Sequence, residues 1–347
     1  MWRKNKMKLR LWLFSLSSLG MASNAMATCI VSPLSGLPVP HYFTIPDTVI
    51  HIDADTRPDT SNPIIAPIDT PKQGYDIKFD QCYTGDLFGK SVMNLSNQGA
   101  SYIFPSNISG IGVKILWNNG AAFSNGQFPT TGKMDFSSSP NNIGSWIYPA
   151  ASFYRVEFYK TSDTLNLDPQ AANMVLMQNN YAYNWVTSDA IGNAGQVLQI
   201  GSIQVISTPS CNFENSKTVD FGTVTGNMLA TGSTIEKPLA FSITCRTDYG
   251  TYSVNTSLSS ESASSDGSYI KVKDSVGSTD TLAIRIKKND GTDIKVDGST
   301  TDTLQSVASN TPAQFSWKAM LMSQPGVQAH PAEGNFTARA EILLQVK

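Results

Sequence analysis

Three aromatic residues at alternate positions have the chemistry of a sugar-binding stripe. Tyr181, Tyr183 and Trp185 would share one face of a strand, and Asn184 lies between them in sequence. Aromatic rings pack against the apolar faces of sugars, and Tyr and Trp keep a polar group at a wet surface. We therefore expect these four residues to bind a ligand. The competing interpretation is that the stripe packs inside a core.

Two further groups combine aromatic and amide side chains near turns. Trp146 and Tyr148 follow an Asn- and Gly-rich loop at residues 141–144, and Asn118 and Asn119 precede a glycine. Loops carry binding residues disproportionately often, so these four residues are also candidate ligand-binding positions. The alternatives are a loop that plugs the end of a sandwich and an ordinary Asn-Asn-Gly turn.

A third candidate is the polar segment between His51 and Asp59. Its carboxylates, Asp53 and Asp55, can accept sugar hydroxyls. The segment lacks the glycine and the final glutamate of an EF-hand loop. His41 and His51 provide only a weak pattern for zinc. We expect neither a metal nor a cofactor, and the alternative for the whole segment is a solvated loop.

Motifs for catalysis are lacking in the sequence. It has no G-x-S-x-G, H-E-x-x-H or P-loop motif. Ser268-Tyr-Ile-Lys271 matches S-x-x-K, but neither S-D-N nor K-T-G accompanies it, and the segment alternates like a strand. We therefore predict that the protein is not an enzyme.

The N-terminus has the pattern of a secretory leader. Residues 1–10 are basic, residues 11–21 are apolar, and Ala25-Met26-Ala27 is a small-x-small cleavage motif. We expect residues 1–27 to be removed; an uncleaved anchor is the alternative. Without the five basic residues of this leader, 20 basic residues face 27 acidic ones. An acidic chain without a basic block is a poor nucleic-acid binder.

The four cysteines permit three pairings. The simplest is Cys29 with Cys82 and Cys211 with Cys245, which gives each half of the chain one disulfide. An exported protein reaches an oxidising compartment where such bonds persist. Loop entropy then predicts about 4 kcal/mol of stabilisation from each bond.

Short runs of alternating apolar and polar residues predict an all-β protein made of two β-sandwiches. Such runs occupy residues 113–117, 154–158, 239–245 and 282–286. One segment, residues 168–177, favours a helix because Asp168 can cap it and proline follows; a strand is the alternative there. Aromatic residues thin out after residue 208, where Ile206–Cys211 resembles a stiff linker. We place one domain at residues 28–208 and another at 209–347.

The second half resembles the pilin domain of bacterial chaperone–usher pili. The residues that carry this resemblance are Cys211, Val219–Val224, Lys237–Cys245 and Gly334–Lys347. The order of the two halves is similar to that of two-domain tip adhesins, in which a lectin-like sandwich precedes the pilin domain. The resemblance implies that the pilin domain is an incomplete immunoglobulin-like sandwich.

The C-terminal segment supports this implication independently. One face of the alternating segment is apolar and continuous, which leaves a sheet edge that invites pairing. A strand from another molecule can complete such an edge. The alternative is the last strand of a complete sandwich. We expect contacts with a chaperone or donor strand at Phe336, Ala338, Ala340, Ile342, Leu344, Val346 and Lys347.

Together, the residues and the resemblance predict a fimbrial tip adhesin that binds a host carbohydrate or glycoprotein. The resemblance implies export through the periplasm to the fimbrial tip at the cell surface. It also implies three assembly partners: a periplasmic chaperone, an outer-membrane usher and a neighbouring pilus subunit. The alternative is a tip or adaptor subunit that builds the fimbria without binding a receptor.

Overall fold

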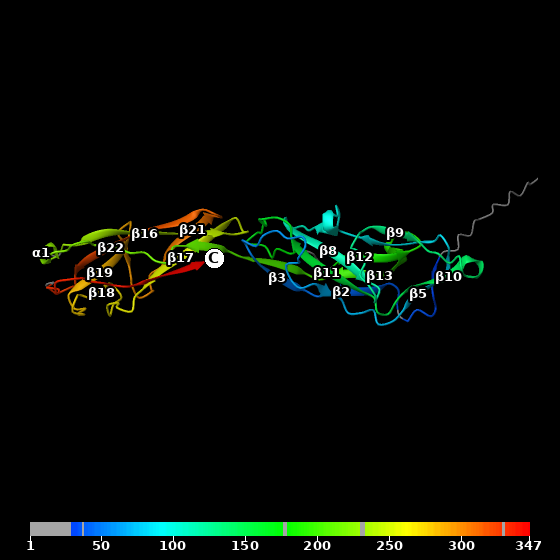
Figure 1. The fold of residues 1–347 in the computed structure, drawn as a ribbon, viewed down its shortest axis with the longest axis horizontal. Coiled ribbons are helices and arrows are strands. Elements are labelled where there is room, and N and C mark those ends of the chain that lie inside the picture. Colours follow the sequence, from blue (N-terminus) through cyan, green and yellow to red (C-terminus); the bar gives the residue numbers. More distant parts are fainter. Residues whose placement is uncertain (1–28, 37, 176–178, 230–232, 328–329) are drawn as a thin grey trace, which may run out of the picture.

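The chain folds into two β-rich blocks arranged end to end (Figure 1). The computed structural model describes residues 29–36, 38–175, 179–229, 233–327 and 330–347. The leader expected over residues 1–27 lies outside the described residues. Each sheet is built from strands on one side of Pro209 only. The all-β sandwich fold predicted from the sequence is confirmed.

The front domain, described from Cys29 to Thr208, has four sheets. Their strand orders are β1-β5-β10, β4-β11-β8-β7, β2-β13-β12-β6-β9 and β14-β3. The strands are β1 (Ile30–Val31), β2 (His41–Ile45), β3 (Thr48–Asp53), β4 (Ile68–Asp69), β5 (Ile77–Tyr83), β6 (Leu87–Val92), β7 (Phe104–Pro105), β8 (Ile111–Asn118), β9 (Thr130–Lys133), β10 (Ile143–Tyr148), β11 (Phe153–Lys160), β12 (Asn179–Val186), β13 (Ala194–Ile200) and β14 (Ile203–Thr208). Short 3-10 turns are η1 (Ala100–Tyr102), η2 (Pro140–Asn142) and η3 (Ile191–Asn193).

We call the block that follows Pro209 the second domain, and its described residues form two sheets. Their orders are β15-β16-β22-β19-β18, with β20 beside β19, and β21-β17-β23. The elements are β15 (Ser210–Phe213), α1 (Gly226–Leu229), β16 (Ile235–Arg246), β17 (Thr251–Ser259), β18 (Ile270–Val272), β19 (Leu282–Lys288), β20 (Asp293–Ile294), β21 (Asp302–Ala308), β22 (Pro312–Ser323) and β23 (Glu341–Val346). None of the helices in the described part of the chain is long and apolar enough to cross a membrane.

The strands form where apolar side chains alternate with polar ones. In β11 the inward residues Tyr154, Val156 and Phe158 are fully buried, and in β22 Phe315 and Trp317 are buried in the same way. Alternation sends one face of each strand into a core and leaves the other face toward solvent. Strands were predicted around residues 113–117, 154–158, 239–245 and 282–286, and β8, β11, β16 and β19 confirm them.

The helix expected over residues 168–177 is wrong for residues 168–175, which are its described part. The carboxylate of Asp168 accepts a hydrogen bond from the N–H of Gln170, 2.8 Å away, which closes a turn. Asn173 has a φ of 47° and donates its side-chain amide to the carbonyl of Asp168. A short polar side chain tolerates this left-handed conformation, which ends a helix rather than continuing it.

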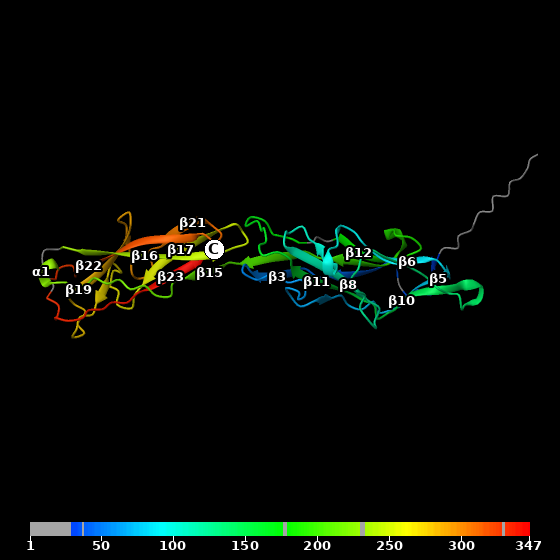
Figure 2. The same cartoon turned by 45° about the horizontal axis from the view of Figure 1, so that its top comes forward.

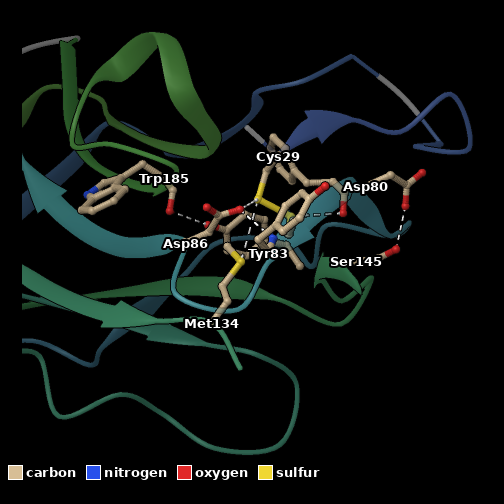
Figure 3. Close-up of a disulfide and its surroundings, with 10 residues drawn as sticks. Cys29, Asp80, Tyr83, Asp86, Met134, Ser145 and Trp185 are labelled. Carbon is tan, nitrogen blue, oxygen red and sulfur yellow. Dashed lines mark hydrogen bonds between the residues drawn. A yellow bond between two sulfur atoms is a disulfide. The ribbon is translucent and has the colours of Figure 1, made fainter. Parts of the chain in front are cut away.

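Both predicted disulfides are present. Cys29 is bonded to Cys82, and Cys211 is bonded to Cys245. The first bond lies at the far end of the front domain, where β1 pairs with β5. Figure 3 shows its surroundings: a sulfur of Cys29 lies 3.6 Å from a carboxylate oxygen of Asp86 and 3.8 Å from the sulfur of Met134. A bonded sulfur has no proton to donate, so these are packing contacts.

Candidate functional sites

The polar segment predicted around Asp53 lines a pocket in the front domain. The pocket has a volume of about 340 Å³ and lies where β3 ends and the following loop passes the end of β11. Its polar lining comes from His51, Asp53, Thr56, Arg57, Asp59, Asn62 and Lys160. Asp55, the other predicted carboxylate, does not line the pocket. Its side chain instead accepts a hydrogen bond of 2.8 Å from the hydroxyl of Ser210 in the second domain.

Some polar groups of this pocket already have hydrogen-bond partners within the protein, whereas others are exposed and can meet a ligand. Asp59 accepts hydrogen bonds from the side chain of Asn62 and from two backbone N–H groups, and these hold the pKa of its carboxyl below the usual value. Lys160 is only 2% exposed, and its ammonium donates to the carbonyl of Thr56 at 2.6 Å. Burial lowers the pKa of Lys160. The exposed side chains of His51, Asp53 and Arg57 are therefore the groups best placed to meet a polar ligand.

The aromatic stripe of β12 lies in the core. Tyr181, Tyr183 and Trp185 are 4%, 7% and 2% exposed. The ring of Trp185 lies over Gly89, where even a Cβ would come within 2.4 Å of it. The hydroxyl of Tyr183 donates to the carboxylate of Asp189 at 2.7 Å in a partly buried position. Burial, followed by that hydrogen bond, raises the pKa of Tyr183 to about 12.

Asn184 is also buried, and its amide belongs to a chain of side-chain hydrogen bonds. It donates to Gln196 at 2.7 Å, and Gln196 donates to Gln73 at 2.7 Å. All three side chains are less than 5% exposed. The side-chain oxygen of Asn184 has no hydrogen-bond partner among the described residues, so only its NH₂ group takes part in this buried chain. The structure thus buries the 181–185 group in the core, as the competing interpretation expects.

The other two aromatic and amide groups are mainly structural as well. Trp146 is half-buried and stacks on Phe88 with ring centres 4.1 Å apart. Tyr148 is buried, and its hydroxyl donates to the carbonyl of Trp185 at 3.2 Å. These contacts resemble the loop plug that was the alternative interpretation.

Asn118 and Asn119 build the turn that follows β8. The side-chain oxygen of Asn118 accepts the N–H of Gly120 at 2.6 Å, and that of Asn119 accepts the N–H groups of Ala121 and Ala122. Asparagine favours turns because its side chain can replace a backbone partner in this way. Of the two, Asn119 is exposed and Asn118 is buried.

The two histidines weighed as metal ligands lie in different surroundings. His41 shares a hydrogen bond of 2.7 Å with the hydroxyl of Tyr75, whereas His51 lines the polar pocket. Burial lowers the pKa of His41. Across the described part of the chain, no three His, Cys, Asp or Glu side chains come together as a metal site would require.

The last strand of the second domain has one unpaired edge among the described residues. β23 pairs with β17 and ends its three-stranded sheet. Its inward residues Ile342, Leu344 and Val346 are only half-buried, as are Phe336 and Ala338 before it, and Ala340 is exposed. Lys347 is exposed too, although its backbone pairs with Ser253 at 2.9 Å in both directions.

A second sheet edge borders the same core. β15 lies at the edge of the larger sheet and pairs only with β16, where Cys211 is opposite Cys245. Cys211 of β15 and Leu344 and Val346 of β23 pack against one buried cluster. Among the described residues, β15 and β23 thus each leave one edge without a strand partner, beside a core that both contact.

Comparison with known proteins identifies this part of the chain. Residues 201–347 match the family model described as Fimbrial protein. By this match the second domain is similar to fimbrial proteins, and we call it the fimbrial domain. This match confirms the resemblance that the second half of the sequence shows to fimbrial subunits. No curated protein matches the chain in sequence.

Solved structures similar to the chain include three fimbrial adhesins. The tip adhesin CupB6 from Pseudomonas aeruginosa has 16% identity and a TM-score of 0.37, with 80% of this chain and 85% of that chain covered. The chaperone–tip subunit complex CsuC–CsuE of Acinetobacter baumannii has 14% identity and a TM-score of 0.34, with 89% and 99% covered. The receptor-binding domain of MrkD1P of Klebsiella pneumoniae has 16% identity and a TM-score of 0.36, with 55% and 99% covered.

Sequence reasoning missed the basic side of the pocket. Lys160 follows Tyr154, Val156 and Phe158 at alternate positions, so the period of two already predicts that it points inward. Arg57 has no comparable signal because it lies in a loop. The pocket joins residues more than 100 positions apart, and only the fold brings them together.

Proposed function

We propose that this chain is a tip adhesin of a chaperone–usher fimbria and binds a host carbohydrate or glycoprotein through its front domain. It is exported through the periplasm and ends at the fimbrial tip on the cell surface. The role is one of binding and assembly, not catalysis. The observation that carries the proposal is the half-open core of the fimbrial domain, which contrasts with the closed core of the front domain.

The half-open core supports assembly by donor-strand complementation. β15 and β23 each have one edge without a strand partner among the described residues, and the apolar side chains of β23 are only partly buried. We place a groove for a donor strand between these two edges. A periplasmic chaperone first covers this groove with one of its own strands. At the outer-membrane usher, a strand of the neighbouring subunit then replaces the chaperone strand. The exposed residue Lys347, next to β23, is a further candidate contact for the chaperone.

The polar pocket is the best candidate for the receptor site. His51, Asp53 and Arg57 supply a donor, an acceptor and a cation at one exposed surface. Sugars are recognised by such hydrogen-bonding groups in a concave site. Trp146 and Asn119 remain secondary candidates because they keep part of their surface exposed.

A non-adhesive tip or adaptor subunit is the second candidate function. The burial of Tyr181, Tyr183 and Trp185 favours it, because that burial removes the main aromatic platform expected for sugars. In this case the front domain would only cap or extend the fimbria.

The test is ligand binding by the full chain with a donor strand fused after Lys347. We expect binding to one class on an array of host glycans and matrix glycoproteins. The variants Asp53→Ala and Arg57→Ala should weaken that binding at least tenfold without lowering the Tm. Lys72→Ala is the matched control, since Lys72 is exposed and lies outside the pocket. Lack of binding by a well-folded protein would favour the adaptor role, and binding unaffected by the pocket variants would move the site elsewhere.

A further inference from the structure

A turn of the fimbrial domain is inserted into the front domain. It comprises residues 247–250 and joins β16 to β17. Asp248 within it is only 2% exposed. One of its carboxylate oxygens accepts the N–H of Leu165 at 2.8 Å, and the other accepts the hydroxyl of Ser207 at 2.7 Å. Its backbone carbonyl accepts the N–H of Leu167 at 3.0 Å. All three partners belong to the front domain.

The neighbours of Asp248 extend the contact. The ring of Tyr249 packs against the main core of the front domain, and its hydroxyl accepts the N–H of Ser207 at 3.2 Å. The guanidinium of Arg246 donates to the carbonyl of Asp163. Both views place this contact where the two blocks meet, near β3 and β17 (Figures 1 and 2). The joint therefore combines apolar packing with several directed hydrogen bonds.

The covalent link at the joint is short. Only Pro209 separates β14 from β15. β14 pairs with β3 in parallel along its whole length, up to Thr208 opposite Asp53. Proline fixes its own φ and restricts the residue before it. A change of angle between the domains would have to break the contacts of the inserted turn.

The inserted turn also supplies hydrogen-bond acceptors to buried N–H groups of the front domain. Leu165 and Leu167 are 4% and 3% exposed and pack in the main core of the front domain. Their N–H groups bond to Asp248. A buried N–H group without a partner costs about 1 to 3 kcal/mol. The nearby charge of Asp248 also raises the pKa of Lys160, against the stronger effect of burial, and Lys160 closes the polar pocket.

We infer that the turn at residues 247–250 is a docking plug through which the fimbrial domain completes the front domain and fixes the angle between the two. Asp248 is the positioning residue of this plug. Through Leu165, Leu167 and Ser207, the plug sets the conformation of the segment at residues 161–167 and of the end of β14. A change within the fimbrial domain therefore reaches the base of the front domain by this route. This inference does not depend on which ligand the front domain binds.

Amide hydrogen exchange of the full chain tests the inference. The variant Asp248→Ala removes both carboxylate acceptors, and Ser207→Ala removes only one bond. We expect exchange in residues 163–167 to become at least tenfold faster in Asp248→Ala, and to change less in Ser207→Ala, while β8 and β19 keep their protection. Asp280→Asn is the matched control because Asp280 is an exposed aspartate of the same domain.

Small-angle X-ray scattering on the same proteins tests the angle. The natural chain should fit a single extended shape, and Asp248→Ala should require a range of interdomain angles. If Asp248→Ala does not fold, Asp248→Asn and Tyr249→Ala replace it and should show the same two changes to a smaller degree. Unchanged exchange at residues 163–167 together with one unchanged shape in these variants would overturn the inference.

Discussion

The inward rows of β11 and β23 are similar in sequence pattern but differ in burial. Tyr154, Val156 and Phe158 of β11 are completely buried, whereas the inward residues of β23 are only half-buried. β11 has a neighbour on each side, β4 and β8, whereas β23 has only β17 among the described strands. The difference is therefore one of neighbours and not of composition. An apolar row becomes a core only when the chain, or a partner, covers it on all sides.

The first prediction is that a donor strand makes the inward residues of β23 as fully buried as those of β11. A strand fused after Lys347 should raise the free energy of unfolding of the fimbrial domain by about 5 kcal/mol. Completing the burial of side chains such as Ile342 and Leu344 contributes about 1 kcal/mol each, and each new backbone hydrogen bond contributes about 1 kcal/mol. For a domain of this size that corresponds to roughly 15 to 20 °C in Tm. Calorimetry of the two proteins measures it.

A matched control uses a donor strand with aspartate at its inward positions. This strand should give little or no gain, because it would bury charge in an apolar groove. Without any strand, less soluble protein should accumulate in the periplasm, because the open edge favours degradation and aggregation. A stable monomer that gains nothing from the strand would contradict the open groove and weaken the proposed assembly with it.

The second prediction compares the two disulfides. Replacing both cysteines of either bond by serine should cost about 4 kcal/mol in the free energy of unfolding of its own domain. The bonds close loops of 53 and 34 residues, so loop entropy favours the front bond by only about 0.4 kcal/mol. Urea unfolding of each double variant measures this. If one double variant lowered the stability of both domains, the two domains would unfold together through their joint, and the prediction of independent effects would be wrong.

The third prediction compares one core residue from each domain. Trp185→Ala should cost about 3 to 5 kcal/mol, as expected for a buried aromatic residue. Ile342→Ala should cost only about 1 kcal/mol in the uncomplemented chain, because its side chain is already partly exposed. With a donor strand fused, the cost at Ile342 should rise to about 2 to 4 kcal/mol.

Thermal unfolding of Trp185→Ala and Ile342→Ala measures these costs. Ile147→Ala is the control, because Ile147 is 45% exposed. Such surface changes usually stay within about 0.5 kcal/mol. If Trp185→Ala instead abolished ligand binding at unchanged Tm, the aromatic stripe of β12 would return as the binding site.

The sequence predicted the fold better than the site, and particular residues show why. Alternation at Val113 or Tyr154 needs only local side-chain direction, and β8 and β11 follow from it. The bond between Cys29 and Cys82 could be predicted because four cysteines permit only three pairings, and the simplest of them joins cysteines within the same half of the chain. The stripe at Tyr181–Trp185 was ambiguous because β12 and β13 are buried on both faces, and alternation does not indicate which face meets solvent.

The pocket and the joint could not be predicted from local patterns. Asp248 is an ordinary aspartate in a turn until the fold places it against Leu165 and Ser207. Likewise, Lys160 and Arg57 are far apart in sequence but line one pocket. Burial at such positions depends on how two sheets or two domains pack together. The sequence of a single strand has no periodic pattern that predicts such packing.

The last prediction concerns the smallest effect, the titration of a single exposed loop carboxyl beside the fimbrial core. Hydrogen bonds from the side chain of Ser264 and from the N–H and hydroxyl of Ser268 lower the pKa of Asp266 to about 2. The folded pKa lies below the unfolded value of about 3.9. The stability that this group contributes is therefore complete above about pH 4, and it is lost as the pH falls through 2. Asp266→Asn should remove this part of the acid dependence without changing the apolar groove. NMR titration of the carboxyl, with Tm measured at pH 6 and pH 3, checks it. A carboxyl that titrates near 4 would show that the loop hydrogen bonds do not persist in solution.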